Sequence, residues 1–411
     1  MRSILAAVSV LALAAACSPT EPAKPAALAP SATAYADLQK LLIEARPGDT
    51  IEIGEGRFDF TDGLSLTVDG VTIKGAGQDK TFISFKGQTG AGEGLLITSD
   101  NVTVTGFTME DPKGDGIKSK GADNITYKDL KVIWTGGPLT TNGAYGVYPV
   151  ESKNVLIDGV TVSGASDAGI YVGQSDNIIV RNSRAEYNVA GIEIENSTNA
   201  DVHDNVATHN AGGILVFDLP DLPKIGGHST RIFNNQVVAN DTPNFAPPGN
   251  IVANVPTGAG VMLMANQNVH VFNNTFDKNQ TTHVLIYGYS FEFKDARYNP
   301  LPRDFVIRDN TYGEGGNNPQ GRLAPLAPAL GGSLPAIVWD GVTTYNGKTE
   351  EVRIVIREKP EVGFINLGLG VTPIDLTKAN PSTTRLPDFE IAEPPAIVLP
   401  QDKPAAAKEG T

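Results

Sequence analysis

Ala168-Gly-Ile-Tyr-Val-Gly-Gln-Ser-Asp-Asn177 returns, almost position for position, as Ala190-Gly-Ile-Glu-Ile-Glu-Asn-Ser-Thr-Asn199. In both stretches a Gly opens an alternating run, and an Asn follows some eight positions later. The same Gly recurs at Gly94, Gly116, Gly146, Gly169, Gly191, Gly213 and Gly260, and the Asn at Asn101, Asn124, Asn154, Asn177, Asn199 and Asn268. The period is about 22 residues, apart from insertions. A period of this length is the signature of a solenoid.

Each period holds two or three short strand-like runs, too little chain to bury a core by itself, whereas stacked repeats bury one together. We therefore predict an all-β fold, a right-handed parallel β-helix. Residues one and three positions after each Gly, such as Ile170 and Val172, should point inward, and those at two and four positions should face solvent. The recurring Asn should form a ladder of side-chain amides from rung to rung.

The points at which the repeat begins and fades predict the two ends of the solenoid. Residues 36–45, with Leu38, Leu41 and Leu42 at helical spacing, predict an amphipathic helix that caps the first strand, Thr50-Ile-Glu-Ile. The repeat fades after His283-Val-Leu-Ile, and strand-like runs in 336–356 do not fit the register. We assign the β-helix to residues 36–310 and a C-terminal extension or cap with strands to 311–393.

The N-terminus predicts export. Arg2 precedes an apolar run from Ile4 to Ala16, which is typical of a signal peptide (1–16) and too short to span a bilayer. Small residues directly before Cys17 resemble a bacterial lipobox, so Cys17 would be lipidated and 17–35 would be a tether. Ordinary cleavage leaving a free thiol is the alternative. We predict a lipoprotein of the periplasm or outer membrane that touches the membrane only through Cys17, with a disordered tail at 394–411.

Composition excludes several classes of protein. The 411 residues include 32 Lys and Arg against 46 Asp and Glu, a formal charge of −14, and no basic cluster, so nucleic-acid binding is not expected. A single Cys excludes a disulfide framework, a Cys-rich zinc site and covalent haem attachment. Phosphate-loop, serine-hydrolase and zinc-protease motifs are absent from the sequence.

Four motifs carry a resemblance to a known family. They are Gly143-Ala-Tyr-Gly-Val-Tyr-Pro-Val, Ser166-Asp-Ala-Gly-Ile-Tyr-Val-Gly-Gln-Ser, Val189-Ala-Gly-Ile-Glu-Ile-Glu-Asn-Ser and Gly212-Gly-Ile-Leu-Val-Phe-Asp-Leu-Pro. Over residues 36–370 the chain resembles a family of exported parallel β-helix repeat proteins, often encoded beside a c-type cytochrome and without an established activity. More distantly it resembles pectate and alginate lyases, uronan C5-epimerases and periplasmic copper-maturation proteins. The resemblance implies fold and compartment, and a c-type cytochrome as partner, but brings no catalytic residue.

Insertions predict a binding groove. They occupy 134–142, 219–228 and 241–258, and all border the same strand column, so loops would wall a groove suited to a linear polymer. The outward side chains of that column are Lys118, Lys120, Tyr148, Tyr171, Glu193, Glu195, Leu215, Phe217 and Asp218. Neighbouring rungs are about 4.8 Å apart, which would bring Tyr148, Tyr171 and Glu193 within one sugar's length.

Chemistry on a uronic-acid polymer would use this column. Lyase or epimerase action requires a neutralised carboxylate and an acid/base group, for which Tyr148, Tyr171 and Glu193 are the catalytic candidates. Glu193, Glu195 and Asp218 would hold Ca²⁺ if that ion is used. Further ligand-binding candidates are Lys118, Lys120 and Phe217. The alternative is a plain solvated strand face.

The histidines give little support to a metal site. His209 and Tyr187 occupy equivalent positions before their Gly and should stack at a rung corner, and loop proximity alone suggests a site between His209 and His228. His209 is also an acid/base candidate if it reaches the groove.

Two functions therefore remain open. The first is a non-enzymatic scaffold that binds a partner such as a c-type cytochrome through an apolar patch, which would comprise Leu215, Phe217, Leu219, Leu222, Met262 and Met264. The second is a lyase, a C5-epimerase or a non-catalytic binder of an acidic polysaccharide. Whether the protein is an enzyme is left open at this stage.

Overall fold

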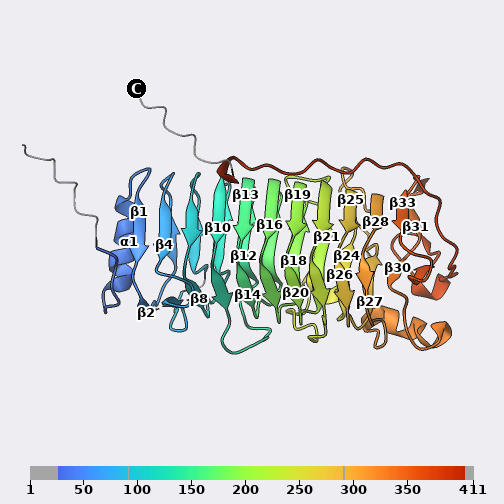
Figure 1. Cartoon of the computed structure of the whole chain (residues 1–411), viewed down its shortest axis with the longest axis horizontal. Helices are drawn as coiled ribbons and strands as arrows, with labels where there is room; N and C mark the ends of the chain where they lie inside the picture. The colour runs from blue at the N-terminus through green and yellow to red at the C-terminus, as the bar shows by residue number, and fades with distance from the viewer. Residues whose placement is uncertain (1–25, 91, 290–291, 403–411) are drawn as a thin grey trace, which may run out of the picture.

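The chain winds into a right-handed parallel β-helix, as the repeat predicts. The computed structural model describes residues 26–90, 92–289 and 292–402. In these residues three long parallel sheets, here named A, B and C, run side by side along the molecule (Figure 1). Each turn of the helix contributes one strand to each sheet, except the last, which contributes strands to sheets A and C alone, and successive turns pair in parallel.

The bounds of the elements are as follows. Sheet A contains β1 (Thr50–Ile53), β4 (Thr72–Gly75), β7 (Thr103–Thr105), β10 (Ile125–Lys128), β13 (Lys153–Asp158), β16 (Asp176–Arg181), β19 (Thr198–His203), β22 (His228–Phe233), β25 (Gln267–Phe272), β28 (Arg303–Arg308) and β33 (Ile354–Arg357). Sheet B contains β2 (Gly56–Asp59), β5 (Thr81–Ser84), β8 (Thr108–Glu110), β11 (Lys131–Ile133), β14 (Thr161–Ser163), β17 (Arg184–Glu186), β20 (Val206–Thr208), β23 (Gln236–Val238), β26 (Thr275–Asp277) and β29 (Thr311–Tyr312). Sheet C contains β3 (Leu64–Leu66), β6 (Leu95–Ile97), β9 (Ile117–Lys120), β12 (Tyr145–Val150), β15 (Ala168–Gly173), β18 (Ala190–Glu195), β21 (Gly212–Phe217), β24 (Ala259–Leu263), β27 (Thr282–Ile286), β30 (Ile337–Trp339) and β34 (Phe364–Asn366). A small sheet contains β31 (Val342–Tyr345), β32 (Lys348–Thr349) and β35 (Gly370–Val371), and the helices are α1 (Ala34–Glu44), η1 (Ile251–Asn254), η2 (Gly321–Leu326), η3 (Pro328–Leu330), η4 (Leu376–Lys378) and η5 (Pro400–Asp402).

The core lies inside the coil. The inward positions predicted from the repeat, including Ile170, Val172, Ile192 and Ile194, are fully buried in one continuous apolar cluster. In-register pairing stacks like on like, because Ile170 lies over Ile192 and Val172 over Ile194. Burial of each such side chain contributes about 1.5–3 kcal/mol, so every added rung extends the core.

The recurring Gly is required by close approach of neighbouring turns. A Cβ added at Gly191 would lie 2.5 Å from the carbonyl oxygen of Gly213, and one at Gly213 would lie 2.5 Å from that of Gly260. Gly116 and Gly146 meet the carbonyl of the next turn in the same way. The Gly column therefore lets successive turns pack closely at the start of sheet C.

The recurring Asn forms the predicted ladder. Asn124 and Asn154 have φ values of 56° and 58°, a left-handed conformation that Asn tolerates better than most residues. The Asn124 amide donates to Asn101 Oδ1 at 3.0 Å, and the Asn154 amide donates to Asn124 Oδ1 at 2.8 Å. Asn177 continues the ladder by donating to Asn154 Oδ1 at 3.2 Å, but Asn199 donates to Asp176 Oδ1 at 2.8 Å instead. The predicted ladder is therefore confirmed from Asn101 to Asn177 and not at Asn199.

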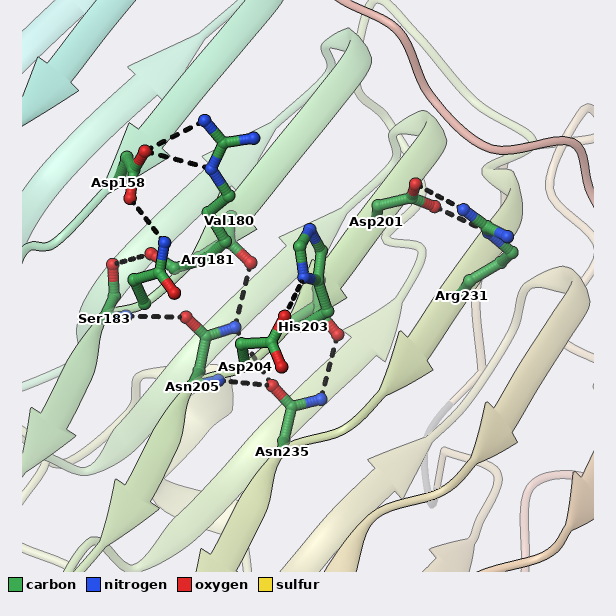
Figure 2. A network of polar contacts seen from close by, with 12 residues as sticks. Asp158, Val180, Arg181, Ser183, Asp201, His203, Asp204, Asn205, Arg231 and Asn235 are labelled. Atoms are coloured by element: carbon green, nitrogen blue, oxygen red, sulfur yellow. Dashed lines mark hydrogen bonds and ion pairs between the residues drawn. The ribbon is translucent and has the colours of Figure 1, made fainter.

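Two further Asn ladders are buried at the other corners, and the repeat analysis did not find them. One comprises Asn188, Asn210, Asn240 and Asn279, and the other Asn205, Asn235, Asn274 and Asn310. Figure 2 shows part of the second ladder, in which Asn205 donates to the Val180 carbonyl at 2.9 Å and to Asn235 Oδ1. Paired polar residues before each corner, such as Asp204-Asn205 and Asn234-Asn235, were the available signal.

Helix α1 covers the N-terminal end of the coil (Figure 1). Leu38 and Leu42 are buried, as predicted, but Leu41 is exposed. The side of α1 that packs on the coil is narrower than the apolar side predicted from Leu38, Leu41 and Leu42. No helix within the described ranges is long and apolar enough to cross a membrane.

At the C-terminal end the coil extends further than the assigned boundary at residue 310. Strands β30, β33 and β34 add turns to sheets A and C, and β33 pairs in register with β28. Within 336–356, β30 and β33 fit the register after an insertion that holds η2 and η3, whereas β31 and β32 pair in the small separate sheet. That insertion displaced the repeat and hid the register in the sequence.

The last described segment corrects the expectation of a loose tail from residue 394. It runs back along sheet A from β33 towards β13 (Figure 1). Glu393 pairs with Arg231 and Arg308, and Leu399 is fully buried against Leu156 and Ile179. We name residues 383–402 the C-terminal strap. The predicted signal peptide, Cys17 and residues 403–411 lie outside the described residues.

Candidate functional site

A cavity of about 430 Å³ lies on the outer face of sheet C, separate from the core of the coil. We name it the sheet C cavity. Its floor comes from β18 and β21, and its cover from the segment 249–255 and from residues 287–289 after β27. Asp167, Glu193 and Glu195 are its acidic lining residues, and Tyr145, Phe217, Tyr287 and Tyr289 are its aromatic ones.

Strand register explains how these side chains meet. Tyr171 on β15 lies beside Glu193 on β18, which in turn lies beside Leu215 on β21. Two positions along, Glu195 lies beside Phe217. Alternation along a strand puts positions two and four after the Gly on the outer face, as the sequence predicted.

The predicted solvent exposure of this column holds for Lys120 but is wrong from Tyr171 onward. Glu193 is 2% exposed, Glu195 6% and Tyr171 3%, because loops and later turns pack over them. The covering side chains include Val252 and Val255 from the insertion at 241–258, and Tyr289 and Tyr298 beyond β27. The sequence signalled the outward direction of the column but not its cover.

Two of the three insertions wall the cavity, as predicted. Leu219 and the segment 249–255 line it. The insertion at 134–142 instead lines a separate open hollow with Phe85 and Lys113.

The acidic groups have raised pKa values. Burial, with the charges of Asp167 and Glu195 added, raises the pKa of Glu193 well above its usual range. Burial likewise raises the pKa of Asp167 to about 7 and that of Glu195 to about 7. With raised pKa values, these carboxyl groups exchange protons closer to neutral pH than ordinary carboxyl groups do, which suits acid/base exchange.

Hydrogen bonds differ among the three carboxyl groups. Glu193 Oε1 is buried and has no hydrogen-bond partner. Glu195 interacts with the Tyr171 hydroxyl, which opposes the rise in its pKa. The Tyr145 hydroxyl donates to Asp167 Oδ2 at 3.4 Å. Sequence reasoning missed Asp167 and Tyr145, since both precede the alternating run. Tyr145 directly precedes Gly146 and Asp167 stands two positions before Gly169, and this place just before a Gly-led strand was the available signal.

The tyrosines form one packed cluster beside the cavity. The ring centroids of Tyr145, Tyr148 and Tyr171 lie 4.5–4.8 Å apart. Tyr171 lies over Gly173, where any Cβ would come within 2.3 Å of its hydroxyl. Tyr171 therefore contacts Glu195 from outside the cavity. Of the three rings, only that of Tyr145 lines the cavity.

The predicted basic ligands do not reach the cavity. Lys118 Nζ pairs with Glu93 at 3.0 Å and Asp115 at 3.3 Å, and lies 4.7 Å from the Tyr148 ring centroid. Lys120 is exposed at the end of β9, outside the cavity. Among the described lining residues none is Lys, Arg or His.

Asp218 anchors a loop. Its carboxylate accepts hydrogen bonds from the Gly226 and Gly227 amides at 2.9 and 2.6 Å, and from Asn266 at 3.1 Å. The Tyr289 and Tyr298 hydroxyls donate to its backbone carbonyl. The predicted set of Glu193, Glu195 and Asp218 is thus not assembled around one point.

No group of three or more His, Cys, Asp or Glu with metal-binding geometry occurs in the described part of the chain. His209 pairs with Asp241 at 2.9 Å, and His228 contacts Ser229. The predicted stack of Tyr187 on His209 is confirmed, with ring centroids 5.2 Å apart and planes 5° apart.

The apolar patch expected to bind a partner is covered. Leu215, Met262 and Met264 are buried, and Leu219 is half-buried, in a second apolar cluster beneath the loops. This patch packs against the chain's own segments, so it is not a free interface.

Comparison with known proteins agrees with the class of fold. Residues 62–221 match the family model described as "Right handed beta helix region". The chain has a right-handed parallel β-helix fold, and the match of residues 62–221 to this family model agrees with it. A search of curated proteins found no match.

Solved structures of the same fold have varied activities. The endo-xylogalacturonan hydrolase of Aspergillus tubingensis is 11% identical, with 80% of this chain and 91% of that chain covered and a TM-score of 0.55. The surface adhesin PfbA of Streptococcus pneumoniae is 12% identical, covering 81% and 94%, with a TM-score of 0.52. The exopolygalacturonase of Thermotoga maritima is 12% identical, covering 69% and 77%, with a TM-score of 0.50. At these identities the similarity establishes the fold alone.

Proposed function

We propose that this protein binds a glycan in the sheet C cavity and hydrolyses a glycosidic bond there. The observation that carries the proposal is the pair Asp167 and Glu195, two carboxyl groups that line one cavity and have pKa values raised by burial to about 7. Glycoside hydrolysis uses a pair of carboxyl groups, one as acid and one as base or nucleophile. A raised pKa keeps one of them protonated at neutral pH.

The surrounding residues suit the same task. The protonated member of the pair would donate its proton to the leaving oxygen, while the ionised member would activate water or attack the sugar. Tyr145 holds Asp167 by a hydrogen bond, and Tyr171 interacts with Glu195. The aromatic lining offers apolar faces on which sugar rings pack.

The cavity favours hydrolysis over the predicted elimination from a uronic-acid polymer. Elimination needs a cation to neutralise the substrate carboxylate. Within the described lining there is no basic side chain, and Lys118 is already paired with Glu93 and Asp115. A uronate would therefore enter a site whose own charges repel it.

The test is incubation of the protein with a panel of neutral, amine-bearing and acidic polysaccharides. Two signals are measured: newly released reducing ends, and the ultraviolet absorbance of unsaturated products. We expect new reducing ends without absorbance, and at least a hundredfold loss of kcat in Glu195→Gln and Asp167→Asn. The control is Glu361→Gln, a change at an exposed site.

Unsaturated products that depend on Glu193 would instead restore the lyase interpretation. Hydrolysis that survives both substitutions would move the reaction away from this cavity. No hydrolysis and no binding across the panel would overturn the proposal.

We also propose, from the sequence, that the mature protein is a lipoprotein of the cell envelope, held by lipid on Cys17. Labelling with an alkyne fatty acid should mark the full-length protein and not Cys17→Ser, and fractionation should move that variant to the soluble fraction. A c-type cytochrome partner is a proposal from the family resemblance alone, to be tested by pull-down from the same fractions.

A further inference from the structure

We propose that the glycan held in the sheet C cavity carries a free amino group, so that the substrate class is an amino sugar rather than a uronic or a fully acetylated sugar. This inference rests on the glycan-binding function proposed above. It is carried by three features of the cavity: its charge, one unpartnered buried oxygen, and its aromatic lining.

The charge of the cavity is one-sided. Asp167, Glu193 and Glu195 line it, and none of the described lining residues carries a positive charge. The nearby Lys118 is paired with two carboxylates outside the cavity. Burial in a cavity without a counter-charge raises the pKa of these three carboxyl groups, and a ligand ammonium would supply the counter-charge that their ionised forms lack, so a cation is favoured over a neutral or anionic group.

Glu193 supplies the specific contact point. Its side chain is buried and lines the cavity, yet its Oε1 has no hydrogen-bond partner. Buried polar atoms are nearly always paired, and an exception in a cavity indicates a group that a ligand completes. A carboxyl oxygen is an acceptor for N–H, and an ammonium group offers three donors to reach it and a neighbouring carboxylate.

The aromatic lining favours the same ligand. Tyr145, Phe217, Tyr287 and Tyr289 line the cavity from three different segments. Faces of aromatic rings attract cations, and they also pack against the apolar faces of sugar rings. A volume of about 430 Å³ is within the usual range for small-ligand sites.

The proposed roles of the carboxyl groups remain distinct. Glu193 binds the amine and positions the sugar, whereas Asp167 and Glu195 carry out the acid/base chemistry of the proposed function. Glu193 is therefore a specificity-determining residue, and its removal should weaken binding of an amine more than it slows turnover.

The experiment compares three tetrasaccharides by calorimetric titration: β-1,4-linked glucosamine, the same oligomer fully N-acetylated, and galacturonic acid. We expect the glucosamine oligomer to bind at least tenfold more tightly than the acetylated one, and the galacturonate oligomer not to bind. Glu193→Gln should remove the preference while leaving the weaker affinity for the acetylated oligomer in place.

A net charge of −14 makes non-specific binding of a polycation a real alternative. Glu361→Gln changes the net charge by the same amount at an exposed site, and it should keep the full preference. Glu195→Gln provides a second cavity variant should Glu193→Gln fail to fold, as judged by circular dichroism, and it too should weaken the preference.

Equal affinity for the amine and acetylated oligomers, or tighter binding of galacturonate, would overturn the amino-sugar inference and leave the glycan function standing. A preference that persists in the cavity variants would overturn it as well, because the amine would then bind elsewhere. Absence of binding to all three, together with no hydrolysis in the assay above, would overturn both.

Discussion

At the residue scale, burial of acidic groups links function to stability. Glu195 has a pKa of about 7 in the folded protein, above the value of about 4.3 for an unperturbed Glu. Between these values the folded form holds a proton that the unfolded form has lost. The contribution of Glu195 to the free energy of unfolding is therefore complete at low pH and is lost as pH rises towards 7. The buried carboxyl groups of this cavity favour a fold that is more stable in mild acid.

We predict that Glu195→Gln removes this pH dependence. The free energy of unfolding of the variant, relative to wild type, should rise by roughly 2 kcal/mol between pH 5 and pH 8, since one pKa unit corresponds to about 1.4 kcal/mol. Urea denaturation at both pH values measures it. Glu361→Gln should show no such difference, and parallel pH profiles for Glu195→Gln and wild type would contradict the prediction.

A second prediction at this scale concerns the effect of the repeated Gly on stability. Gly191→Ala should lower the free energy of unfolding by about 2 kcal/mol, because the new Cβ would meet the Gly213 carbonyl at 2.5 Å and the buried Asn210 amide at 2.9 Å. Gly87→Ala is the matched control, since its Cβ finds no atom nearer than 3.9 Å. Equal urea midpoints for the two variants would show that close approach is not the reason for the Gly.

At the element scale, the C-terminal strap is the least expected part of the fold. It crosses several rungs of sheet A and is held at separate points, by Arg357 to Asp388, by Arg231 and Arg308 to Glu393, and by burial of Leu399. Its attachments are side-chain contacts to strands that are complete without it. The strap should therefore open locally without unfolding the coil.

We predict that Leu399→Ala loosens the end of the strap. Loss of a fully buried Leu side chain costs about 2 kcal/mol or more, so hydrogen exchange in residues 395–402 should accelerate at least tenfold while exchange in sheets A, B and C stays unchanged. Val398→Ala, at a neighbouring position that is 68% exposed, should change neither. Faster exchange throughout the sheets would mean that the strap is part of the cooperative unit.

At the scale of the whole molecule, the coil is a one-dimensional stack whose ends need covers. An uncovered first turn would present unpaired strand edges and an open apolar core, which promote association. Helix α1 covers this end with Leu38 and Leu42, both buried.

We predict that Leu38→Asp exposes that end and produces oligomers, detected by size-exclusion chromatography with light scattering. Ile43→Asp is the control on the opposite side of α1, where Ile43 is 68% exposed, and it should leave the elution profile of wild type unchanged. A Leu38→Asp protein that elutes as wild type does would show that α1 is dispensable as a cover.

The periodic features of this protein were determined by its sequence. The Gly and Asn columns, the inward Ile and Val and the outward direction of Glu193 repeat every turn, and a repeat makes each local preference visible many times over. Such positions depend only on contacts with the next turn, which is always about 22 residues away. The last turns and the strap escaped prediction because insertions shift or end the period.

The candidate site was decided by the tertiary structure. Sequence placed Tyr171, Glu193 and Glu195 in one outward column, but their burial depends on residues 249–255 and on Tyr289 and Tyr298, which come from later turns. The raised pKa of Glu193 follows from that cover and from Asp167, which lies outside the alternating run. Desolvation is a property of everything packed around a group, and no local pattern of residues encodes it.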